Sequence, residues 1–490
     1  TCEINATVKG AGGILGQSGY NIFMSKIAMN GKVVGGSNVG AFIGTVSSGA
    51  SLEIKSSYTS ADLYAQGVTD RNLGSNSANV YVIKKQGTVD AVATQLTVEQ
   101  MKGEAAKENM TGLSFRYVWE TVENDFPVYN PKDGVWDGSV VSSYDDFEGS
   151  GTEEDPYLIE NGAQLAFATS KNSNLADASH YKLVKDIVLN DTSYDGWEAD
   201  ARGWLWNDKA RFNGELDGDG YTIEGLYWNT KSNGRLGLFA YIGKLDSGNT
   251  HVATVKNIKF VGASINNPGA KSSSLEGAAV VAGQASGETV FENIYIDETS
   301  AVNAPNIKGV AGIVGRGYNE GKKAHVTIKN CAVLATITGG EHVGAFTGTF
   351  WDTKVVITAE NSFANTTYGL LGANSGTTVM TNTYTTTVGS YDTGAVQVDA
   401  DKMIGEAAKE NMPALDYICT WEIVDGDFPV LRKGGIEAWD GSVATELEGE
   451  GTKENPYKVS NGAELYYMVS AFSNVAYDKA PENTPYFEIT

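Results

Sequence analysis

Short segments of alternating apolar and polar residues recur along the chain, each preceded by a glycine-rich apolar stretch. Four of them are VKNIKF, FENIYI, IKNCAV and AENSFA, and the stretches before them are GLFAYIG, VVAGQASG, VAGIVGRG and VGAFTGTF. Alternation with a period of two is typical of a strand with one buried face. Because the same order returns every 31 to 37 residues, we expect successive coils of strands to stack on one another.

Each alternating segment carries an asparagine at the same place, followed by a small or apolar residue. These are Asn257, Asn293, Asn330 and Asn361. Asparagine tolerates the left-handed backbone that a sharp corner needs, and stacked amides can hydrogen-bond to one another. We therefore predict an all-β, right-handed parallel β-helix in which these residues form a structural ladder at one corner. The alternative, a β-sandwich of hairpins, requires regularly spaced two-residue turns that the sequence lacks.

A longer period organises the whole chain. GEAAKENM and WDGSV both return about 300 residues later, and GTEEDPYLIENGAQL returns at the same shift in the altered form GTKENPYKVSNGAEL. One unit is thus seen about 1.6 times, and we expect the chain to be a fragment of a longer tandem array. The predicted parts are 1–96 (coils ending one unit), 97–150 (helix and linker junction), 151–396 (β-helix unit), 397–450 (copy of the junction) and 451–490 (truncated start of the next unit).

Helices are expected only as short caps between the coils. The pairs Asn161–Gln164, Asn461–Glu464 and Thr97–Gln100 have the spacing of a capping box. The first two open the short apolar segments GAQLAFA and GAELYYM, and the third opens a helix over VEQMKGEAAKENM.

The composition agrees with an all-β chain and argues against some classes of binding partner. The 58 glycines against 10 prolines, without a collagen period, indicate many tight turns. The formal charge of −24 argues against nucleic acid and anionic membranes, because phosphate contact needs a basic surface. Such acidity is typical of a solvated surface, with calcium-holding loops as the alternative. No apolar run in the sequence is long enough to predict membrane insertion.

The order of motifs resembles the GLUG-repeat surface proteins of anaerobic, mostly gut-dwelling bacteria. It runs from GTEEDPYLIENGAQL through YKLVKDIVLND, FNGELDGDGYTIEGLYW and VKNIKF to the segment around GEAAKENM. The resemblance covers nearly the whole chain. It implies a right-handed β-helix, secretion and a role as adhesin, fibre stalk or surface layer. Such repeats also accompany IgA-specific metallopeptidases, whose catalytic domain lies elsewhere. Two segments depart from the pattern: the expanded DGWEADARGWLWND and the added loop GKLDSGNTHVATV.

No catalytic motif is recognisable. The four histidines form no HExxH, and no GxSxG is present. Asp217 and Asp219 are weak candidates for a carboxylate pair or a calcium site, since they flank glycines and lack EF-hand spacing. We predict that the chain is not an enzyme and has no cofactor.

Three tryptophans, Trp204, Trp206 and Trp228, form the aromatic cluster of the sequence. Trp204 and Trp206 alternate, so on a strand both rings would face the same side. Sugar binding by stacking is one hypothesis, and packing over the end of a core is the one we favour.

The sequence therefore predicts an extracellular, structural or adhesive tandem-repeat protein of a bacterial surface. Its expected partners are further copies of its own unit, joined head to tail by covalent continuation or self-association, together with extracellular glycans or a host surface. The alternatives are a carbohydrate-binding or carbohydrate-active β-helix and the non-catalytic stalk of a surface peptidase.

Overall fold

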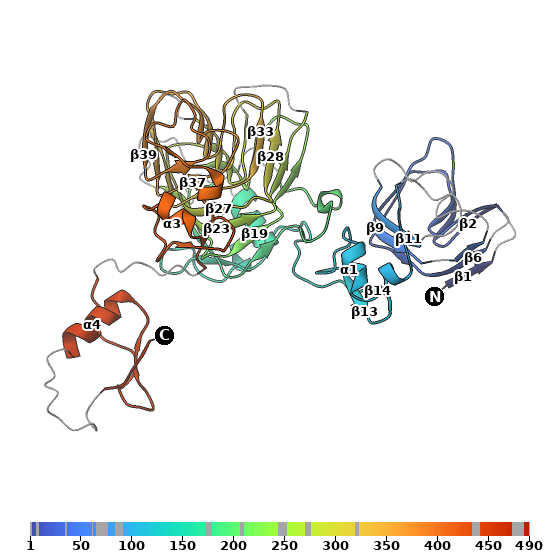
Figure 1. Cartoon of the computed structure of the whole chain (residues 1–490), viewed down its shortest axis with the longest axis horizontal. Coiled ribbons are helices and arrows are strands. Elements are labelled where there is room, and N and C mark those ends of the chain that lie inside the picture. Colours follow the sequence, from blue (N-terminus) through green and yellow to red (C-terminus); the bar gives the residue numbers. More distant parts are fainter. Residues whose placement is uncertain are drawn as a thin grey trace. The chain divides into compact units, whose positions relative to one another are not determined.

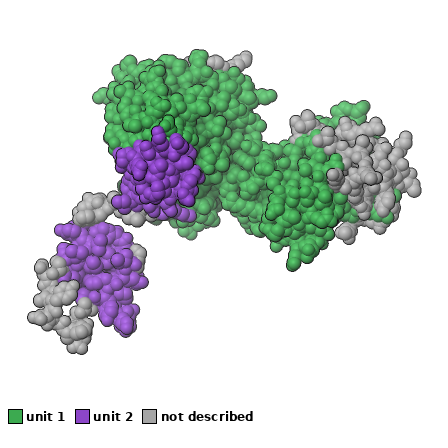
Figure 2. Space-filling model, in the orientation of Figure 1, with its two compact units in different colours: residues 1–400 green, residues 401–490 purple. Residues whose placement is uncertain are grey.

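Parallel pairing dominates the described residues, and it joins strands that are 12 to 43 residues apart in sequence. The computed structural model describes residues 2–5, 9–34, 37–60, 62–64, 77–83, 92–171, 179–205, 210–243, 252–269, 276–318, 323–433, 442–472 and 485–489. They belong to two compact units, residues 1–400 and residues 401–490 (Figure 2).

The largest sheet of the first unit has 14 strands (Figure 1). Its central strands are β23 (Ala253–Val261) and β27 (Glu288–Ile296), which pair in parallel over seven positions. The other strands are β15 (Tyr157–Ile159), β16 (His180–Leu183), β17 (Ile187–Val188), β18 (Glu215–Asp217), β19 (Thr222–Glu224), β31 (Ala324–Lys329), β32 (Ala332–Val333), β36 (Val355–Glu360), β37 (Phe363–Ala364), β39 (Thr377–Thr381), β40 (Tyr384–Thr385) and β41 (Val396–Gln397).

Three smaller parallel sheets take up the strands that lie between those of the large sheet. The first contains β20 (Tyr227–Asn229), β24 (Ser264–Asn266), β28 (Ala301–Ala304) and β33 (Thr336–Gly339). The second contains β21 (Arg235–Leu236), β25 (Gly277–Ala278), β29 (Val310–Ala311) and β34 (Val343–Gly344). The third contains β22 (Phe239–Ile242), β26 (Ala282–Ala285), β30 (Val314–Gly317), β35 (Thr347–Phe350) and β38 (Leu371–Asn374). From β23 to β35 the chain visits the four sheets in the same order on each pass.

The alternating pattern of the sequence explains the core. Within the register, Val255 pairs with Phe291, Phe291 with Ile328, and Ile328 with Ala359. All four side chains are fully buried. Because like positions stack, every apolar side chain of such a column is covered by the next one, and burial of this kind contributes about 1.5–3 kcal/mol for each large side chain.

Residues 1–96 repeat the plan with a second, smaller core. Met24, Val33, Phe42, Ile54 and Val80 pack together there. The strands, also paired in parallel, are β1 (Cys2–Asn5), β2 (Lys9–Gly12), β3 (Leu15–Ser18), β4 (Ile22–Ser25), β5 (Ala28–Met29), β6 (Gly31–Val34), β7 (Ser37–Gly40), β8 (Ile43–Val46), β9 (Leu52–Thr59), β10 (Asp62–Tyr64), β11 (Ala78–Ile83) and β12 (Thr94–Leu96).

The helix expected over VEQMKGEAAKENM is wrong as a single element. It is two short helices, η1 (Glu99–Met101) and α1 (Ala105–Asn109), separated by Gly103 at φ +54°. Its copy breaks in the same way between η5 (Ala400–Lys402) and α3 (Ala407–Asn411), at Gly405 with φ +53°. A left-handed glycine ends an α-helix, so helix propensity on either side does not carry through it. An antiparallel hairpin follows each pair: β13 (Trp119–Val122) with β14 (Asp125–Tyr129), and β42 (Trp421–Glu422) with β43 (Val430–Leu431).

The remaining helices are short. Asn161 caps α2 (Gly162–Ala166), because its side chain accepts hydrogen bonds from the backbone of Ala163 and Gln164. A π-helical turn (Phe167–Lys171) continues α2, and η2 (Tyr144–Asp146) and η4 (Trp197–Ala199) are single turns. In the second unit α4 (Gly462–Phe472) accompanies the parallel pair β44 (Tyr457–Val459) and β45 (Phe487–Ile489). Across the residues that the structure covers, no helix is long and apolar enough to span a bilayer.

Candidate functional site

The asparagines of the large sheet all occupy left-handed backbone positions. Their φ angles are +57° at Asn257, +53° at Asn293, +52° at Asn330, +48° at Asn361 and +50° at Asn382. Only glycine, asparagine and aspartate adopt this conformation at little cost. The residue type is therefore matched to the corner at which β23, β27, β31, β36 and β39 bend or end.

Side-chain hydrogen bonds join some of these asparagines but not all of them. Asn293 Nδ2 donates to Asn257 Oδ1 at 2.6 Å, and Asn382 Nδ2 donates to Asn361 Oδ1 at 3.0 Å. Between these two pairs the run is interrupted, because Asn293 Oδ1 is buried without a partner and so accepts nothing from Asn330. At the other end, Asn257 Nδ2 donates to Asp217 Oδ1 at 2.9 Å.

The same corner exists in residues 1–96, where the sequence gives little sign of it. Lys26, Ser56 and Asn79 have φ angles of +56°, +45° and +57°. The backbone N–H of Lys26 donates to the carbonyl of Lys55 at 3.1 Å, as that of Asn330 donates to Glu360 at 3.0 Å. At Lys26 and Ser56 the backbone geometry of the corner is thus kept although the amide is absent, whereas Asn79 has both.

Asp217 and Asp219 form a turn whose neighbours are lysines. Asp219 Oδ2 lies 3.2 Å from Lys182 Nζ, and Asp217 Oδ2 lies 3.6 Å from Lys256 Nζ. Asp217 Oδ1 also accepts from the backbone N–H of Asp219 at 2.8 Å. A calcium ion needs six to eight oxygen ligands, whereas cations stand beside both carboxylates here. Within the described ranges no three His, Cys, Asp or Glu side chains are grouped to hold a metal.

The hypothesis of sugar stacking is wrong for Trp204 and Trp228. These side chains are 5% and 6% exposed, and both belong to the main core. Their Nε1 atoms donate to backbone carbonyls, Trp204 to Leu238 and Trp228 to Gly237, each at 3.1 Å. Trp204 also lies outside any strand, and its ring centroid is 5.0 Å from that of Trp136. Trp206, the third member of the predicted cluster, lies outside the described residues.

Sequence reasoning missed a polar contact between the junction segment, residues 97–150, and the strands that follow it. Arg116 Nη1 donates to both carboxylate oxygens of Glu224, at 3.0 and 2.8 Å. Glu224 Oε1 also accepts from the backbone and the hydroxyl of Thr192, at 3.0 and 2.9 Å. Nearby, the hydroxyl of Ser114 donates to Asp191. Partial burial lowers the pKa of Arg116, but the hydrogen bond and the charge of Glu224 outweigh it and leave that pKa raised.

The expanded segment DGWEADARGWLWND extends this contact. The backbone N–H of Asp195 donates to the carbonyl of Thr111 at 2.9 Å, and Asn79 Nδ2 donates to the carbonyl of Asp195 at 2.8 Å. Lys55 Nζ donates to the carbonyl of Ala199 at 2.7 Å. The hydroxyl of Ser56 donates to Asp200. We call the contacts of residues 111–116 and Lys55, Ser56 and Asn79 with residues 191–200 and Glu224 the copy junction. In the sequence, the expanded segment DGWEADARGWLWND was the one feature that could have indicated the copy junction.

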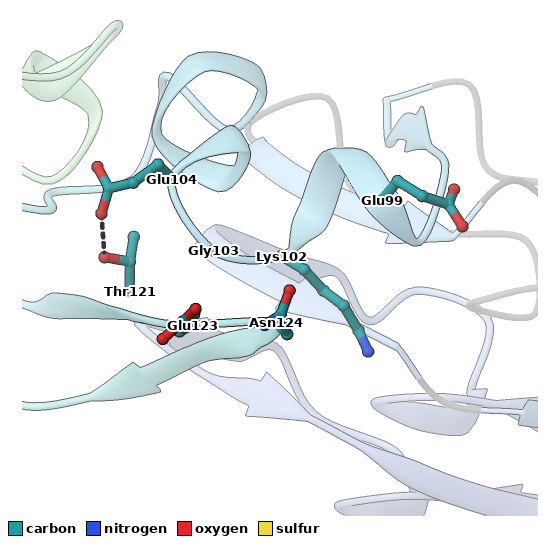
Figure 3. A pocket seen from close by; sticks show the side chains of 7 residues that line it. All are labelled: Glu99, Lys102, Gly103, Glu104, Thr121, Glu123 and Asn124. Atoms are coloured by element: carbon teal, nitrogen blue, oxygen red, sulfur yellow. Dashed lines mark hydrogen bonds between the residues drawn. The ribbon is translucent and has the colours of Figure 1, made fainter.

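A shallow pocket of about 590 Å³ lies between η1, α1 and the β13–β14 hairpin (Figure 3). Within it Thr121 Oγ1 donates to Glu104 Oε1 at 2.7 Å. The pKa of Glu104 is lowered by hydrogen bonds from Lys107 and Thr121, and that of Glu99 by a hydrogen bond from its own backbone and one from Thr97. A general acid at neutral pH needs a raised carboxyl pKa, which is the opposite of what these carboxyls have. The lining residues are Glu99, Lys102, Gly103, Glu104, Thr121, Glu123 and Asn124.

Comparison with known proteins gives partial matches. No protein-family model matches the chain. A candidate Gly-rich membrane protein of Evansella cellulosilytica is 30% identical over 169 residues, which is 34% of this chain and 16% of that protein. Halomucin of Haloquadratum walsbyi is 25% identical over 235 residues, 47% of this chain and 2% of its own length. The chain thus spans a small part of these relatives.

One solved structure was also found to be similar. It is a candidate immunoglobulin A1 protease of Bacteroides ovatus, which aligns over 58% of this chain and 94% of its own. The sequence identity is 18% and the TM-score is 0.35.

Proposed function

We propose that this chain is a structural and adhesive segment of an extracellular surface protein, built from stacked β-helical coils. In this proposal residues 151–396 form one right-handed parallel β-helix, and units of about 300 residues continue head to tail as a stalk or filament. The chain would then be a member of the GLUG-repeat surface proteins, with no catalytic role of its own.

The observation that carries the proposal is the in-register stacking of strands from successive passes. In the sheet of β20, β24, β28 and β33, Trp228 pairs with Ile265, Ile265 with Val302, and Val302 with Ile337. All four side chains are buried. Such a column can be extended by adding passes without redesigning the core, and this is the property that a stalk needs.

The copy junction supports head-to-tail continuation. It joins the end of one repeat copy to the beginning of the next through Arg116 with Glu224 and Ser114 with Asp191. A guanidinium that contacts both oxygens of a carboxylate fixes the orientation of the two side chains as well as their distance. In the second junction segment Asp416 and Ile418 stand in place of Ser114 and Arg116, so this contact supports a stiff connection between the first copy and the second.

The names of the relatives are compatible with a surface location, since one is described as a membrane protein and the other as Halomucin. Binding of neutral sugars through the tryptophan cluster is not part of the proposal, because Trp204 and Trp228 are buried.

Immunogold electron microscopy tests the proposal in cells of the organism that makes the protein. Antibodies raised against the 490-residue chain should label the surface of intact, unpermeabilised cells, with gold particles on stalks or filaments. Labelling that appears only inside sectioned cells would contradict a surface role. Labelling confined to the cell envelope, without stalks or filaments, would contradict the filament and would still support the surface location.

A further inference from the structure

Three arginines gather around two tyrosines beside the sheet of β22, β26, β30, β35 and β38. The guanidinium carbons of Arg211 and Arg235 lie 4.1 and 5.0 Å from the ring centroid of Tyr241. That of Arg316 lies 5.6 Å from the ring of Tyr318. Such distances are within the range of cation–π contact. In a chain with a net charge of −24, a cluster of three cations is unusual.

The strand register places Arg316 at the centre of this cluster. Tyr241 pairs with Gln284, Gln284 with Arg316, and Arg316 with Thr349. Arg235 reaches the same column, since its Nε donates to Gln284 Oε1 at 3.2 Å. One column thus brings together two guanidinium groups, an amide and a hydroxyl.

Two glycines allow neighbouring strands to pack closely against this column. A Cβ at Gly277 would lie 3.0 Å from Arg316 Cγ and 2.1 Å from the carbonyl oxygen of Gly283. A Cβ at Gly309 would lie 3.3 Å from Thr349 Oγ1. The place that a side chain would fill at these two positions is therefore taken by backbone carbonyls and by the side chains of Arg316 and Thr349. We call the group formed by Arg235, Gln284, Arg316 and Thr349 the arginine slot.

The guanidinium of Arg316 is not satisfied by the protein. Arg316 is 7% exposed, and its Nη1 is buried without a hydrogen-bond partner. Burial and the charge of Arg235 both lower its pKa. Glu276 is a nearby acid and interacts with Arg235, but its own Oε2 also lacks a partner. A buried charged donor left unpaired is costly and calls for an anion.

We propose that the arginine slot binds one small oxyanion, a carboxylate or a sulfate group, through Arg316 and Arg235. The planar guanidinium presents paired N–H donors that fit two oxygens of such a group. Acidic sugars and small organic acids both carry these groups. Tyr318, whose ring lies beside the Arg316 guanidinium, is 39% exposed. The proposal goes beyond the structural role and does not depend on it.

The first repeat copy supplies a natural control. Gln17 pairs with Thr45 there, as Arg316 pairs with Thr349 in the second copy. The same backbone position therefore accepts a neutral amide within the same fold. Arg316→Gln is the matched variant, and Lys409→Gln, at an exposed ion pair with Glu406, controls for the loss of one positive charge.

Isothermal titration of the 490-residue chain at low ionic strength tests the slot with three probes: sodium glucuronate, sodium sulfate and glucose. We expect wild type and Lys409→Gln to bind glucuronate, sulfate or both, and not glucose. Arg316→Gln should lower the affinity for the anion by about tenfold or more, which corresponds to the loss of one charged hydrogen bond. Binding of glucuronate alone assigns a carboxylate, and binding of sulfate alone assigns a sulfate.

A second variant keeps the test decisive if Arg316→Gln does not fold. Gln284→Glu places a carboxylate inside the slot at nearly constant volume, and we expect it to abolish anion binding while retaining the circular dichroism of the wild type. The proposal is overturned if neither anion binds the wild type, or if whichever of the two variants folds binds as tightly as the wild type.

Discussion

Position 293 meets two demands at once, one on its backbone and one on its side chain. Its φ of +53° is left-handed, and its amide donates to Asn257 Oδ1 at 2.6 Å. The asparagine pattern in the sequence was enough to predict this kind of residue at a corner. Lys26 and Ser56 have the same backbone geometry in the first copy. Because lysine and serine have no preference for a left-handed backbone, the sequence does not predict the corner there. There the surrounding strands impose the conformation.

Replacing Asn293 by alanine should lower the free energy of unfolding by about 2–3 kcal/mol, since a left-handed alanine costs about 1–2 kcal/mol and a lost hydrogen bond about 1 kcal/mol. Asn293→Gly removes the amide but tolerates the backbone, so it should lose less. Urea denaturation of both variants measures the two parts. Equal stability of Asn293→Ala and wild type would show that the corner is not held by this residue.

Cys331 allows a prediction about pH. Burial raises the pKa of its thiol to about 12, whereas an unfolded cysteine titrates near 8.5. Below about pH 8.5 both states keep the proton, so the contribution to stability is fully present. Above it the unfolded thiol ionises while the folded one does not. Stability should therefore fall between about pH 9 and 12, by up to about 1.4 kcal/mol per pH unit.

Burial also raises the pKa of Tyr58, Tyr81 and Tyr227. Cys331→Val isolates the effect of the thiol, because these tyrosines remain in both proteins. The difference in unfolding free energy between wild type and variant should change steadily from pH 8 to pH 10.5. If denaturation curves give the same difference at every pH, the thiol is not protected in the way we describe.

At the scale of elements, the sequence predicts strands better than contacts between distant segments. Alternating residues around Ile258 and Ile294 are enough to predict β23 and β27, and the period of the motifs predicts their parallel pairing. The break at Gly103 was missed because helix-forming residues lie on both sides of it. The copy junction was missed for another reason: Arg116 and Glu224 are 108 positions apart, and neither belongs to a repeated motif.

Arg116→Ala should loosen the copy junction. Glu224 is 10% exposed at its side chain, and the variant leaves its carboxylate with only Thr192 among the partners described above. We expect amide hydrogen exchange in residues 111–119 and 190–202 to become roughly fivefold faster, which corresponds to about 1 kcal/mol of local stability.

Lys409→Ala is the matched control for the junction, because Lys409 and Glu406 form an ion pair that is largely exposed, at 46% and 77%. Exposed pairs contribute little, so exchange should not change. Equal exchange in Arg116→Ala and Lys409→Ala would mean that the Arg116–Glu224 pair does not hold the two copies together.

At the scale of the whole molecule, the repeat is the feature that the sequence conveys most fully. All-β composition, parallel sheets and the recurrence of a helical segment at both junctions follow from motifs that return after about 300 residues. The arginine slot did not follow from them. Its residues come from strands β21, β26, β30 and β35, and only the register that pairs Gln284 with Arg316 brings them together.

Successive passes of the chain stack in register, and the distance between two residues several passes apart measures this stacking. Asn229 pairs with Asn266, Asn266 with Asn303, and Asn303 with Thr338, so three steps separate the first residue from the last. Both end positions are exposed and accept a nitroxide label after the three native cysteines are replaced.

Electron paramagnetic resonance on the chain labelled at Asn229 and Thr338 gives this distance. Three steps of about 4.8 Å place the two backbones about 14 Å apart, so the labels should be separated by less than about 20 Å with a narrow distribution. A separation above about 30 Å, or a broad distribution without a short component, would contradict the stacking on which the whole account rests.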